Sequence, residues 1–231
     1  MLDIGGESTR PGATPIPPDE EQSRVLPLIQ ALAGQGALIS IDTRNASTMA
    51  AALDAGAAIV NDVSGLTHDP RAAPLVAERG CRVVLMHSRG TPQTMQALRH
   101  YGDLVADVKA ELVARIEAAE RAGVRRESIA IDPGIGFAKT ASQNVELLRR
   151  LSEFSMFGLP VLVGVSRNRF IGTFGGEPDA TRRLPGSLAA ALFALDHGAQ
   201  ILRVHDIAET AQAVRIWQTL AAKPNVMGSG A

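Results

Sequence analysis

Short apolar runs alternate along the chain with longer segments of helical spacing, and this alternation restricts the fold more than any other feature. The apolar residues of each run are nearly continuous, which is typical of parallel strands covered on both faces. No linker or shift in composition separates the runs, so the sequence predicts a single α/β domain over residues 1–231. The predicted strands are residues 1–5, 38–42, 58–62, 83–87, 128–132, 161–165 and 201–205.

Three segments between these runs have the spacing of amphipathic helices. Residues 103–122 carry apolar side chains three or four positions apart, and residues 25–32 and 213–220 do the same. Pro27 lies inside one of these segments, so we expect it to kink that helix or to delay its start.

The polar residues distinguish between two architectures, a doubly wound open sheet and a (β/α)8 barrel. An open sheet gathers its functional residues at one switch point, whereas a barrel builds its site from the C-terminal ends of all its strands. Nearly every run here ends in a polar residue, and no GxGxxG motif follows the first run. The sequence therefore predicts a TIM (β/α)8-type barrel, with seven of its strands recognised. The polar strand ends are Asp42, Asn61, Asp62, His87, Asp132, Ser166, Arg167, Arg203 and His205.

Composition excludes several classes of partner. The net charge of −1 argues against a nucleic acid recognised by bulk electrostatics. A single cysteine, Cys81, cannot form an internal disulfide and offers no metal-ligand spacing. We find no apolar run long enough to cross a membrane and no signal peptide, so we expect a cytoplasmic protein that does not bind membranes.

Asp42, Asn61 and Asp132 would point into the mouth of a barrel. There a carboxylate can accept two parallel N–H bonds from a flat heterocycle, and an amide can both donate and accept. The alternative is that a polar residue at a strand end caps the helix that follows it. We favour this capping role for two other aspartates, Asp62 and Asp69. For Asp132 we favour ligand binding, because glycines within residues 133–137 allow the backbone to approach a ligand closely.

Arg203 and His205 lie two positions apart on one predicted strand, so their side chains share a face. Arginine offers a planar pair of donors for phosphate, and late barrel strands often carry phosphate sites. This pair predicts an anion site; the alternative is a surface pair between Arg203 and Asp206.

Two loops add further donors. Residues 5–12 carry hydroxyl groups and a guanidinium on a flexible backbone, as a lid that orients an anion would. The second loop covers residues 164–172, and a helix beginning near Asn168 would attract an anion to its N–H groups. His87 is either part of the site or a packed supporting group. No nucleophile has a base beside it in the sequence, so we expect group transfer by positioning and electrostatics.

Several motifs, in this order, resemble those of the dihydropteroate synthase family. They are DIGGESTRPG at 3–12, ISIDT at 39–43, VNDVSG at 60–65, LMH at 85–87, RGTPQTM at 89–95, IDPGIGF at 131–137 with Lys139, GVSR at 164–167, GSLAA at 186–190 and RVHD at 203–206. The resemblance covers essentially the whole chain. It implies a pterin-binding TIM barrel and a transferase of folate biosynthesis that is the target of sulfonamides. The enzyme would condense 6-hydroxymethyl-7,8-dihydropterin pyrophosphate with p-aminobenzoate to give 7,8-dihydropteroate and pyrophosphate.

The resemblance also implies roles for individual residues and a homodimer. Arg203, His205, Thr9 and Arg10 would act in catalysis, the first two at the pyrophosphate. The pterin would contact Asp42, Asn61, Asp132, Phe137, Gly164 and Asn168, and p-aminobenzoate would contact Thr9, Arg10, Pro11, Ser166 and Arg167.

Two departures from the family pattern stand out. The family binds Mg2+ through an asparagine of an NVTPDSF-like first strand, which we expect before Met1, so strand 1 is missing from this chain and its metal ligands are unknown. Asn168 stands where the family has a lysine, which removes a charge next to the pterin. Two alternative functions are therefore a pterin-binding homologue with impaired catalysis and a pterin-dependent methyltransferase on the same barrel.

Overall fold

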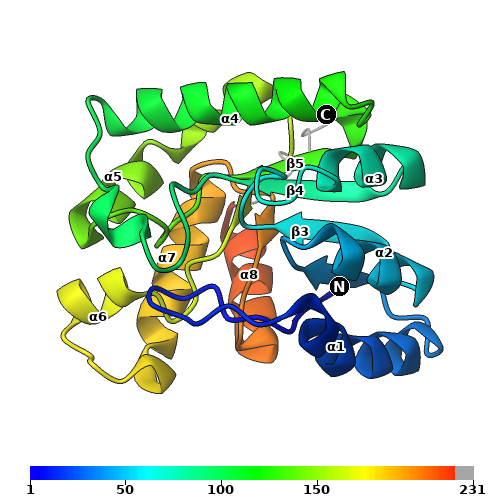
Figure 1. Ribbon diagram of the computed structural model, residues 1–231. Helices are drawn as coiled ribbons and strands as arrows, with labels where there is room; N and C mark the ends of the chain where they lie inside the picture. Colours follow the sequence, from blue (N-terminus) through cyan, green and yellow to red (C-terminus); the bar gives the residue numbers. More distant parts are fainter. Residues whose placement is uncertain (222–231) are drawn as a thin grey trace, which may run out of the picture.

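Seven parallel strands form a curved sheet in the computed structural model, which describes residues 1–221 (Figure 1). Five strands pair in chain order, and two further strands pair with each other. An isolated parallel bridge between Ile131 and Val161 connects the two groups. The strands are β1 (Leu2–Gly5), β2 (Ile39–Asp42), β3 (Ile59–Asp62), β4 (Arg82–Met86), β5 (Ile129–Asp132), β6 (Leu162–Val163) and β7 (Ile201–Leu202).

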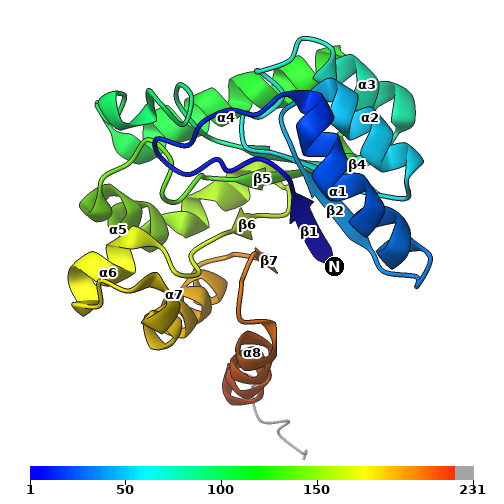
Figure 2. The same ribbon diagram turned by 60° about the horizontal axis from the view of Figure 1, so that its bottom comes forward.

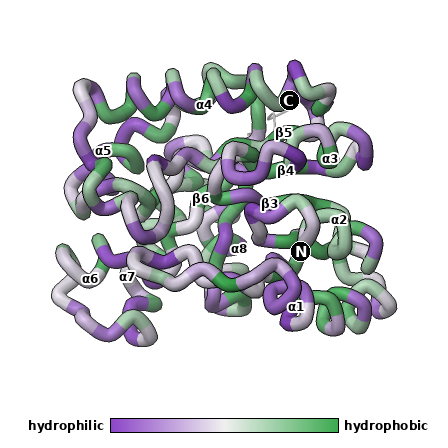
Figure 3. The backbone as a smooth tube through the Cα atoms, viewed as in Figure 1, coloured by the Kyte–Doolittle hydropathy of each residue, from purple (hydrophilic) through white to green (hydrophobic). Residues whose placement is uncertain are grey.

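The helices lie outside the curve of the sheet (Figure 2). Along α4, apolar and polar stretches alternate turn by turn, as expected for a helix with one face on the sheet (Figure 3). The helices are α1 (Pro18–Ala33), α2 (Ala46–Asp54), α3 (Ala72–Arg79), α4 (Leu104–Arg121), α5 (Ala141–Arg149), α6 (Arg169–Gly175), α7 (Leu184–Asp196) and α8 (Ile207–Ala221). Within residues 1–221, no helix is both long and apolar enough to cross a membrane.

The sheet has two apolar faces with different partners. Side chains such as Ile41, Val60 and Leu85 belong to the large core that includes the helices. A separate small cluster contains Ile59, Val84 and Leu162, with Ala130 and Ile201 packed against them. Residues of the small cluster alternate along their strands with residues of the large core, so the small cluster fills the inner, concave face. This arrangement is that of a barrel-type sheet, as the sequence predicted.

The first and last strands line opposite parts of one cavity of about 440 Å³, which includes Leu2, Ile4, Ile201 and Leu202. Side chains also connect these two ends, because Arg203, directly after β7, bonds to Asp3 in β1. The curve of the sheet therefore brings its first and last strands to one place.

All seven predicted strands are confirmed, and the largest differences are at β6 and β7, which have two residues each where five were predicted. The prediction that Arg203 and His205 share one strand is wrong, since β7 ends at Leu202. Arg203 still donates its N–H to Val163, whereas the N–H of His205 bonds to the hydroxyl of Ser166. The chain leaves the sheet there because a side chain replaces the neighbouring strand as acceptor.

The predicted helices are also confirmed, with one correction. Pro27 does not delay α1, which already begins at Pro18. The helix can start at Pro18 because the N–H that proline lacks would be unpaired in the first turn anyway. Asp19, Glu20 and Glu21 in that turn interact favourably with the positive end of the helix dipole.

Candidate active site

The inner face of the barrel becomes polar two residues beyond its apolar cluster. Asn61 follows Ile59 by two positions, Asp132 follows Ala130, and Arg203 follows Ile201. Since side chains two apart on a strand share a face, these groups lie above the apolar cluster at the C-terminal end of the barrel. A polar site with an apolar floor results.

Arg203 bridges two carboxylates. Its Nε donates to Asp3 Oδ2 at 2.6 Å and its Nη2 to Asp42 Oδ2 at 2.8 Å. Asn61 Nδ2 also donates to Asp3 Oδ2, at 3.1 Å. The other oxygen of each carboxylate, Oδ1, is buried without a hydrogen-bond partner among the described residues. Two carboxylates and one guanidinium leave an excess negative charge, and both free oxygens can accept from a ligand.

This excess charge perturbs Asp42. Burial raises the pKa of Asp42 most, and the negative charge of Asp3 raises it further. The positive charge of Arg203 opposes both effects, and the pKa reaches about 7. Burial and the neighbouring carboxylate therefore favour the protonated form of Asp42, and a cationic or N–H-donating ligand would stabilise its ionised form.

Asp132 is buried at the end of β5. Its Oδ1 accepts the N–H of Gly134 at 2.7 Å. Burial raises its pKa to about 6, although this hydrogen bond and the charge of Lys139 act in the opposite direction. Gly134 has a φ of +73°, and a Cβ there would lie 1.9 Å from the carbonyl oxygen of His87. The glycine is thus required for the loop that holds Asp132.

His205 lies among cationic groups. Its Nδ1 lies 3.0 Å from Ser166 Oγ. Burial and the charges of Arg167, Arg203 and Arg10 lower its pKa, so the imidazole is neutral at pH 7. If the Ser166 hydroxyl donates to Nδ1, the ring proton sits on Nε2 and can be donated to an anion. Ser166, which the resemblance assigns to p-aminobenzoate, thus lies on the predicted pyrophosphate side.

The surface pair considered for Arg203 is formed by a different arginine. Arg167 binds Asp206 through Nε at 3.2 Å and Nη2 at 2.6 Å. Its backbone has a φ of +59°, and its N–H donates to Ser187 Oγ. Arg203 is therefore free of Asp206. Gly164 lies beside Arg203, where a Cβ on the glycine would be 3.8 Å from the Cβ of the arginine.

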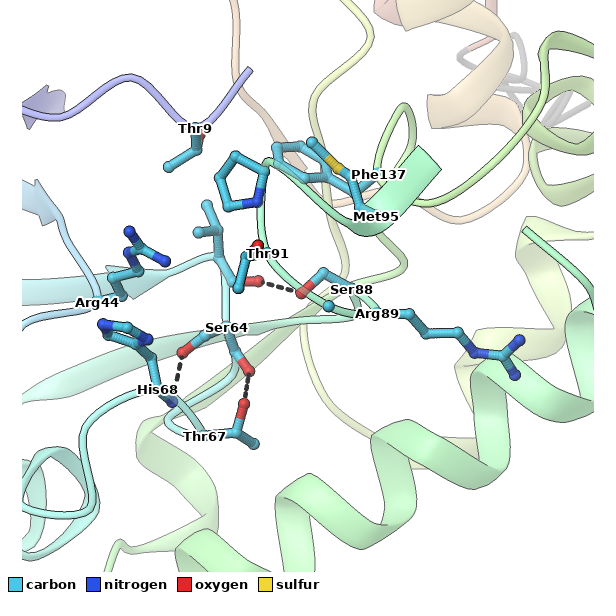
Figure 4. A pocket seen from close by; sticks show the side chains of 13 residues that line it. Thr9, Arg44, Ser64, Thr67, His68, Ser88, Arg89, Thr91, Met95 and Phe137 are labelled. Carbon is cyan, nitrogen blue, oxygen red and sulfur yellow. Dashed lines mark hydrogen bonds between the residues drawn. The ribbon is translucent and has the colours of Figure 1, made fainter. Parts of the chain in front are cut away.

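A second cavity, of about 340 Å³, lies under the loop after β1. Thr9 lines it from the loop, with Phe137 and Met95 nearby and with Arg44 and Ser64 on other sides (Figure 4). Arg10 and Pro11, next to Thr9, are exposed. Of the residues predicted to contact p-aminobenzoate, Thr9 is the one that lines this cavity.

Asn168 is the N-cap of α6, which confirms the helix start predicted there. Its Oδ1 accepts the N–H of Phe170 at 3.3 Å. The side chain also lies against the loop after β5, since a Cβ on Gly136 would be 2.6 Å from Asn168 Nδ2. Asparagine is among the best N-cap residues, whereas lysine is not, so this position has a local role in the helix start.

His87 is a packed supporting group. Its side chain is fully buried, with Nδ1 3.0 Å from Lys139 Nζ and Nε2 3.1 Å from Glu111 Oε2. Lys139 also bonds to the carbonyl oxygens of Gly134 and Phe137, both at 3.0 Å. Burial lowers the pKa of His87 to about 3 and that of Lys139 to about 7. This cluster fastens the loop between Asp132 and Lys139 from below.

Both predicted capping aspartates bind backbone N–H groups. Asp62 accepts from Ser64 and Leu66 in the loop after β3. Asp69 accepts from Arg71 and also from Ala46, the first residue of α2. The prediction that each caps the following helix is wrong: Asp62 binds only the loop after β3, and α3 has no side-chain cap. Asp69 instead binds the first N–H of α2, a helix that precedes it in the chain.

Sequence reasoning missed Asp3 and Arg44. Asp3 lies between Leu2 and Ile4, and this alternation was the signal that it faces inward from β1. Arg44 carried no such signal, because its partner, Glu7, is 37 residues away in the chain.

The chain is similar to known proteins over nearly its whole length. The pattern of the family described as pterin binding enzyme matches residues 1–205. A dihydropteroate synthase of Synechocystis sp. is 46% identical over 221 residues, which cover 95% of this chain and 76% of that protein. The dihydropteroate synthase of Escherichia coli is 43% identical over 227 residues, covering 97% of this chain and 80% of that protein.

Solved structures agree. Xanthomonas albilineans dihydropteroate synthase with 4-aminobenzoic acid has a TM-score of 0.91 and 46% identity, covering 96% of this chain and 80% of that chain. The same enzyme in complex with 7,8-dihydropteroate has a TM-score of 0.88 and 43% identity, with the same coverage. The barrel-type fold predicted from the sequence is confirmed.

Asp132→Asn is expected to change the pH dependence of stability. The folded-state pKa of Asp132, about 6, exceeds the ordinary aspartate value of 3.8. Its protonated form therefore stabilises the fold at low pH, and this contribution is lost as pH rises from about 4 to about 6. Asparagine avoids the buried charge, so the variant should be more stable than the parent at pH 7 by about 1–3 kcal/mol. The difference should shrink toward pH 4.

Urea unfolding of both proteins between pH 4 and pH 8 measures this difference. Stability profiles that run parallel over the whole range would contradict the pKa assigned to Asp132.

Proposed function

The chain belongs to the family of pterin-binding enzymes, and we infer from this membership that it is a dihydropteroate synthase of folate biosynthesis. It is a transferase that condenses 6-hydroxymethyl-7,8-dihydropterin pyrophosphate with p-aminobenzoate. The amine nitrogen bonds to the methylene carbon, the carbon–oxygen bond breaks, and pyrophosphate leaves with the bonding electrons. The amine releases a proton, and the products are 7,8-dihydropteroate and pyrophosphate.

One observation supports this reaction more than any other: a guanidinium stands over buried acceptors at the mouth of the barrel. The side chain of Arg203 is 44% exposed, so it can meet an anion from solvent while bonded to Asp3 and Asp42 beneath it. His205 provides a neutral N–H donor nearby, and Arg10 adds positive charge. A departing pyrophosphate would be stabilised by these donors.

The acceptors below Arg203 fit a pterin. Asp132 and Asn61 face inward over the apolar cluster, where the ring system would lie. The free Oδ1 of Asp42 can accept one of the ring's N–H groups. Electron donation from the pterin would support positive charge on the methylene carbon as the carbon–oxygen bond breaks, so the weakly basic aromatic amine can attack without a strong base.

The remaining contacts follow the resemblance. Phe137 and Gly164 would form walls of the pterin pocket. Thr9, Arg10 and Pro11 would bring the loop after β1 over p-aminobenzoate, whereas Ser166 and Arg167 lie beside His205 and Asp206. The cavity under Thr9, with the aromatic ring of Phe137 on one side, supports this placement of a flat aromatic substrate.

Mg2+ is proposed as the cofactor. Mg2+ is usually held by one or two carboxylates together with substrate phosphates, and the free Oδ1 of Asp3 is such a donor. The negative charge that Asp3 and Asp42 share also fits a cation. When bound, the ion would neutralise charge on the pyrophosphate.

We further propose a cytoplasmic homodimer. Large apolar side chains are exposed on α8, where Ile207, Ile216 and Leu220 are 59%, 59% and 80% exposed. Exposed apolar side chains gathered on one element are typical of protein interfaces, which supports a second copy as partner.

A pterin-binding protein without synthase activity is the second candidate, favoured by the capping role of Asn168. An assay of the purified chain with both substrates and Mg2+ separates the two. The synthase produces dihydropteroate and pyrophosphate in equal amounts. Calorimetric binding of the pterin pyrophosphate without any product would support the second candidate. No observation favours a methyltransferase, because methyl transfer does not need the cationic groups around Arg203.

Arg203→Lys is expected to lower kcat/KM for the pterin pyrophosphate by about 10- to 100-fold. Lysine keeps the charge but cannot donate to Asp3 and Asp42 in parallel while facing an anion. Arg71→Lys is the matched control, since Arg71 also pairs with an aspartate but lies far out in solvent. Activity of Arg203→Lys within twofold of the parent would contradict the proposed role.

Asn168→Lys is expected to raise the rate and lower the stability. The lysine would restore the charge that the family has beside the pterin, worth about tenfold or more in rate. Loss of the cap on α6 would cost about 1 kcal/mol in the free energy of unfolding. Asn168→Ala is the control, because it loses the cap without adding a charge. Equal rates for the two variants would show that the lysine is not needed here.

Asp3→Asn is expected to raise the half-saturating Mg2+ concentration by about tenfold, because it removes the charged ligand that the protein supplies. Titration of the parent and the variant with Mg2+ during turnover measures this change. An unchanged half-saturating concentration would exclude Asp3 as a ligand.

A further inference from the structure

The segment from Glu7 to Ile16, here called the substrate loop, is fixed at its base by a buried ion pair. Arg44 donates from Nε to Glu7 Oε2 and from Nη2 to Glu7 Oε1, both at 2.9 Å. The side chains are 8% exposed for Arg44 and 4% exposed for Glu7. Two parallel bonds between planar groups fix orientation as well as distance.

The same carboxylate closes the loop on itself. Glu7 Oε1 also accepts the N–H of Ile16, at 3.4 Å. Glu7, the first residue of the substrate loop, therefore binds both the last residue of the loop, Ile16, and the segment after β2. Before the loop, Gly6 packs so tightly on α1 that a Cβ would lie 2.9 Å from the carbonyl oxygen of Glu21. The chain entering the loop has no room to swing at this point.

The tip of the loop is held more weakly. The N–H of Gly12 donates to the carbonyl of Pro92 at 2.8 Å, and the side chain of Gln93 donates to the carbonyl of Ala13. Both contacts are exposed to water. The base is buried and charged, so the tip can lift while the base stays in place. Thr9 lies between base and tip and lines the same cavity as Arg44.

A buried ion pair is a poor way to gain stability, because removing two charges from water costs about as much as their attraction returns. Its advantage is a defined geometry. Here that geometry sets the position of Thr9 above the cavity and does not involve the pterin-reading groups Asn61 and Asp132.

We propose that Glu7 and Arg44 are positioning residues for the second substrate. They fix the base of the substrate loop and thereby determine how tightly p-aminobenzoate binds under Thr9. The inference rests on the proposed function and adds two residues that act through the loop without touching the substrate.

The test uses Glu7→Gln, Arg44→Gln and the double variant. Each single change leaves a buried charge without its partner and lowers stability, whereas the double variant leaves two neutral amides. The double variant is therefore the decisive protein. Arg79→Gln is the matched control, because Arg79 pairs with Asp54 at the surface, at the end of α3 away from the site.

Steady-state kinetics and calorimetry are run at a temperature where all variants are folded. In the double variant, KM for p-aminobenzoate should rise about tenfold, the effect of losing one charge-assisted contact. The kcat should stay within about threefold, and the Kd of the pterin pyrophosphate should not change. Arg79→Gln should match the parent in all three quantities.

Hydrogen exchange gives a second measurement that needs no turnover. Amides of the substrate loop, Gly12 among them, should exchange faster in the double variant, while those of β5 should not. If the parent forms no dihydropteroate, the proposed function fails, but exchange together with calorimetric binding of p-aminobenzoate still tests the positioning role.

Two results would overturn the proposal. One is an unchanged affinity for p-aminobenzoate, whether or not loop exchange is faster. The other is a loss of affinity for both substrates in proportion to the loss of stability, which would indicate a general structural role.

Discussion

The cost of burying charge determines how this barrel is built. Its inner face holds Asp42 and Asp132 above an apolar cluster, where water cannot fully solvate them. The guanidinium of Arg203 makes the first of these burials tolerable by bonding to Asp42 and Asp3 together. The same contact connects the last strand to the first. One side chain thus contributes to the sheet and to the site.

Buried polar contacts also hold the loops around the mouth. Lys139 fastens the loop after β5 through His87 and two backbone carbonyls. Glu7 and Arg44 fasten the loop after β1. In both cases a proposed ligand-binding residue, Asp132 or Thr9, lies in the fastened loop or directly before it. The bases of these loops are therefore fixed in position, while their tips remain accessible to solvent.

Much of the fold could be predicted because it depends on local patterns. Near-continuous apolar runs identified all seven strands, and helical spacing identified α4 within a residue at each end. The two errors have different causes. β7 ends early because the hydroxyl of Ser166 accepts the N–H of His205, a contact that no pattern along the chain reveals. α1 begins at Pro18 because the first turn of a helix does not need the N–H that proline lacks.

The sequence by itself determined the strands, the polar residues at their ends and the family resemblance, since each of these is written in neighbouring residues. The tertiary structure alone decided which polar groups meet. Arg203 binds Asp3, 200 positions away, and not Asp206 close by in the chain. Glu7 binds Arg44 because the loops after β1 and β2 lie at the same rim of the barrel. Such pairings follow from the curvature of the sheet and the burial it imposes, and no spacing along the chain encodes them.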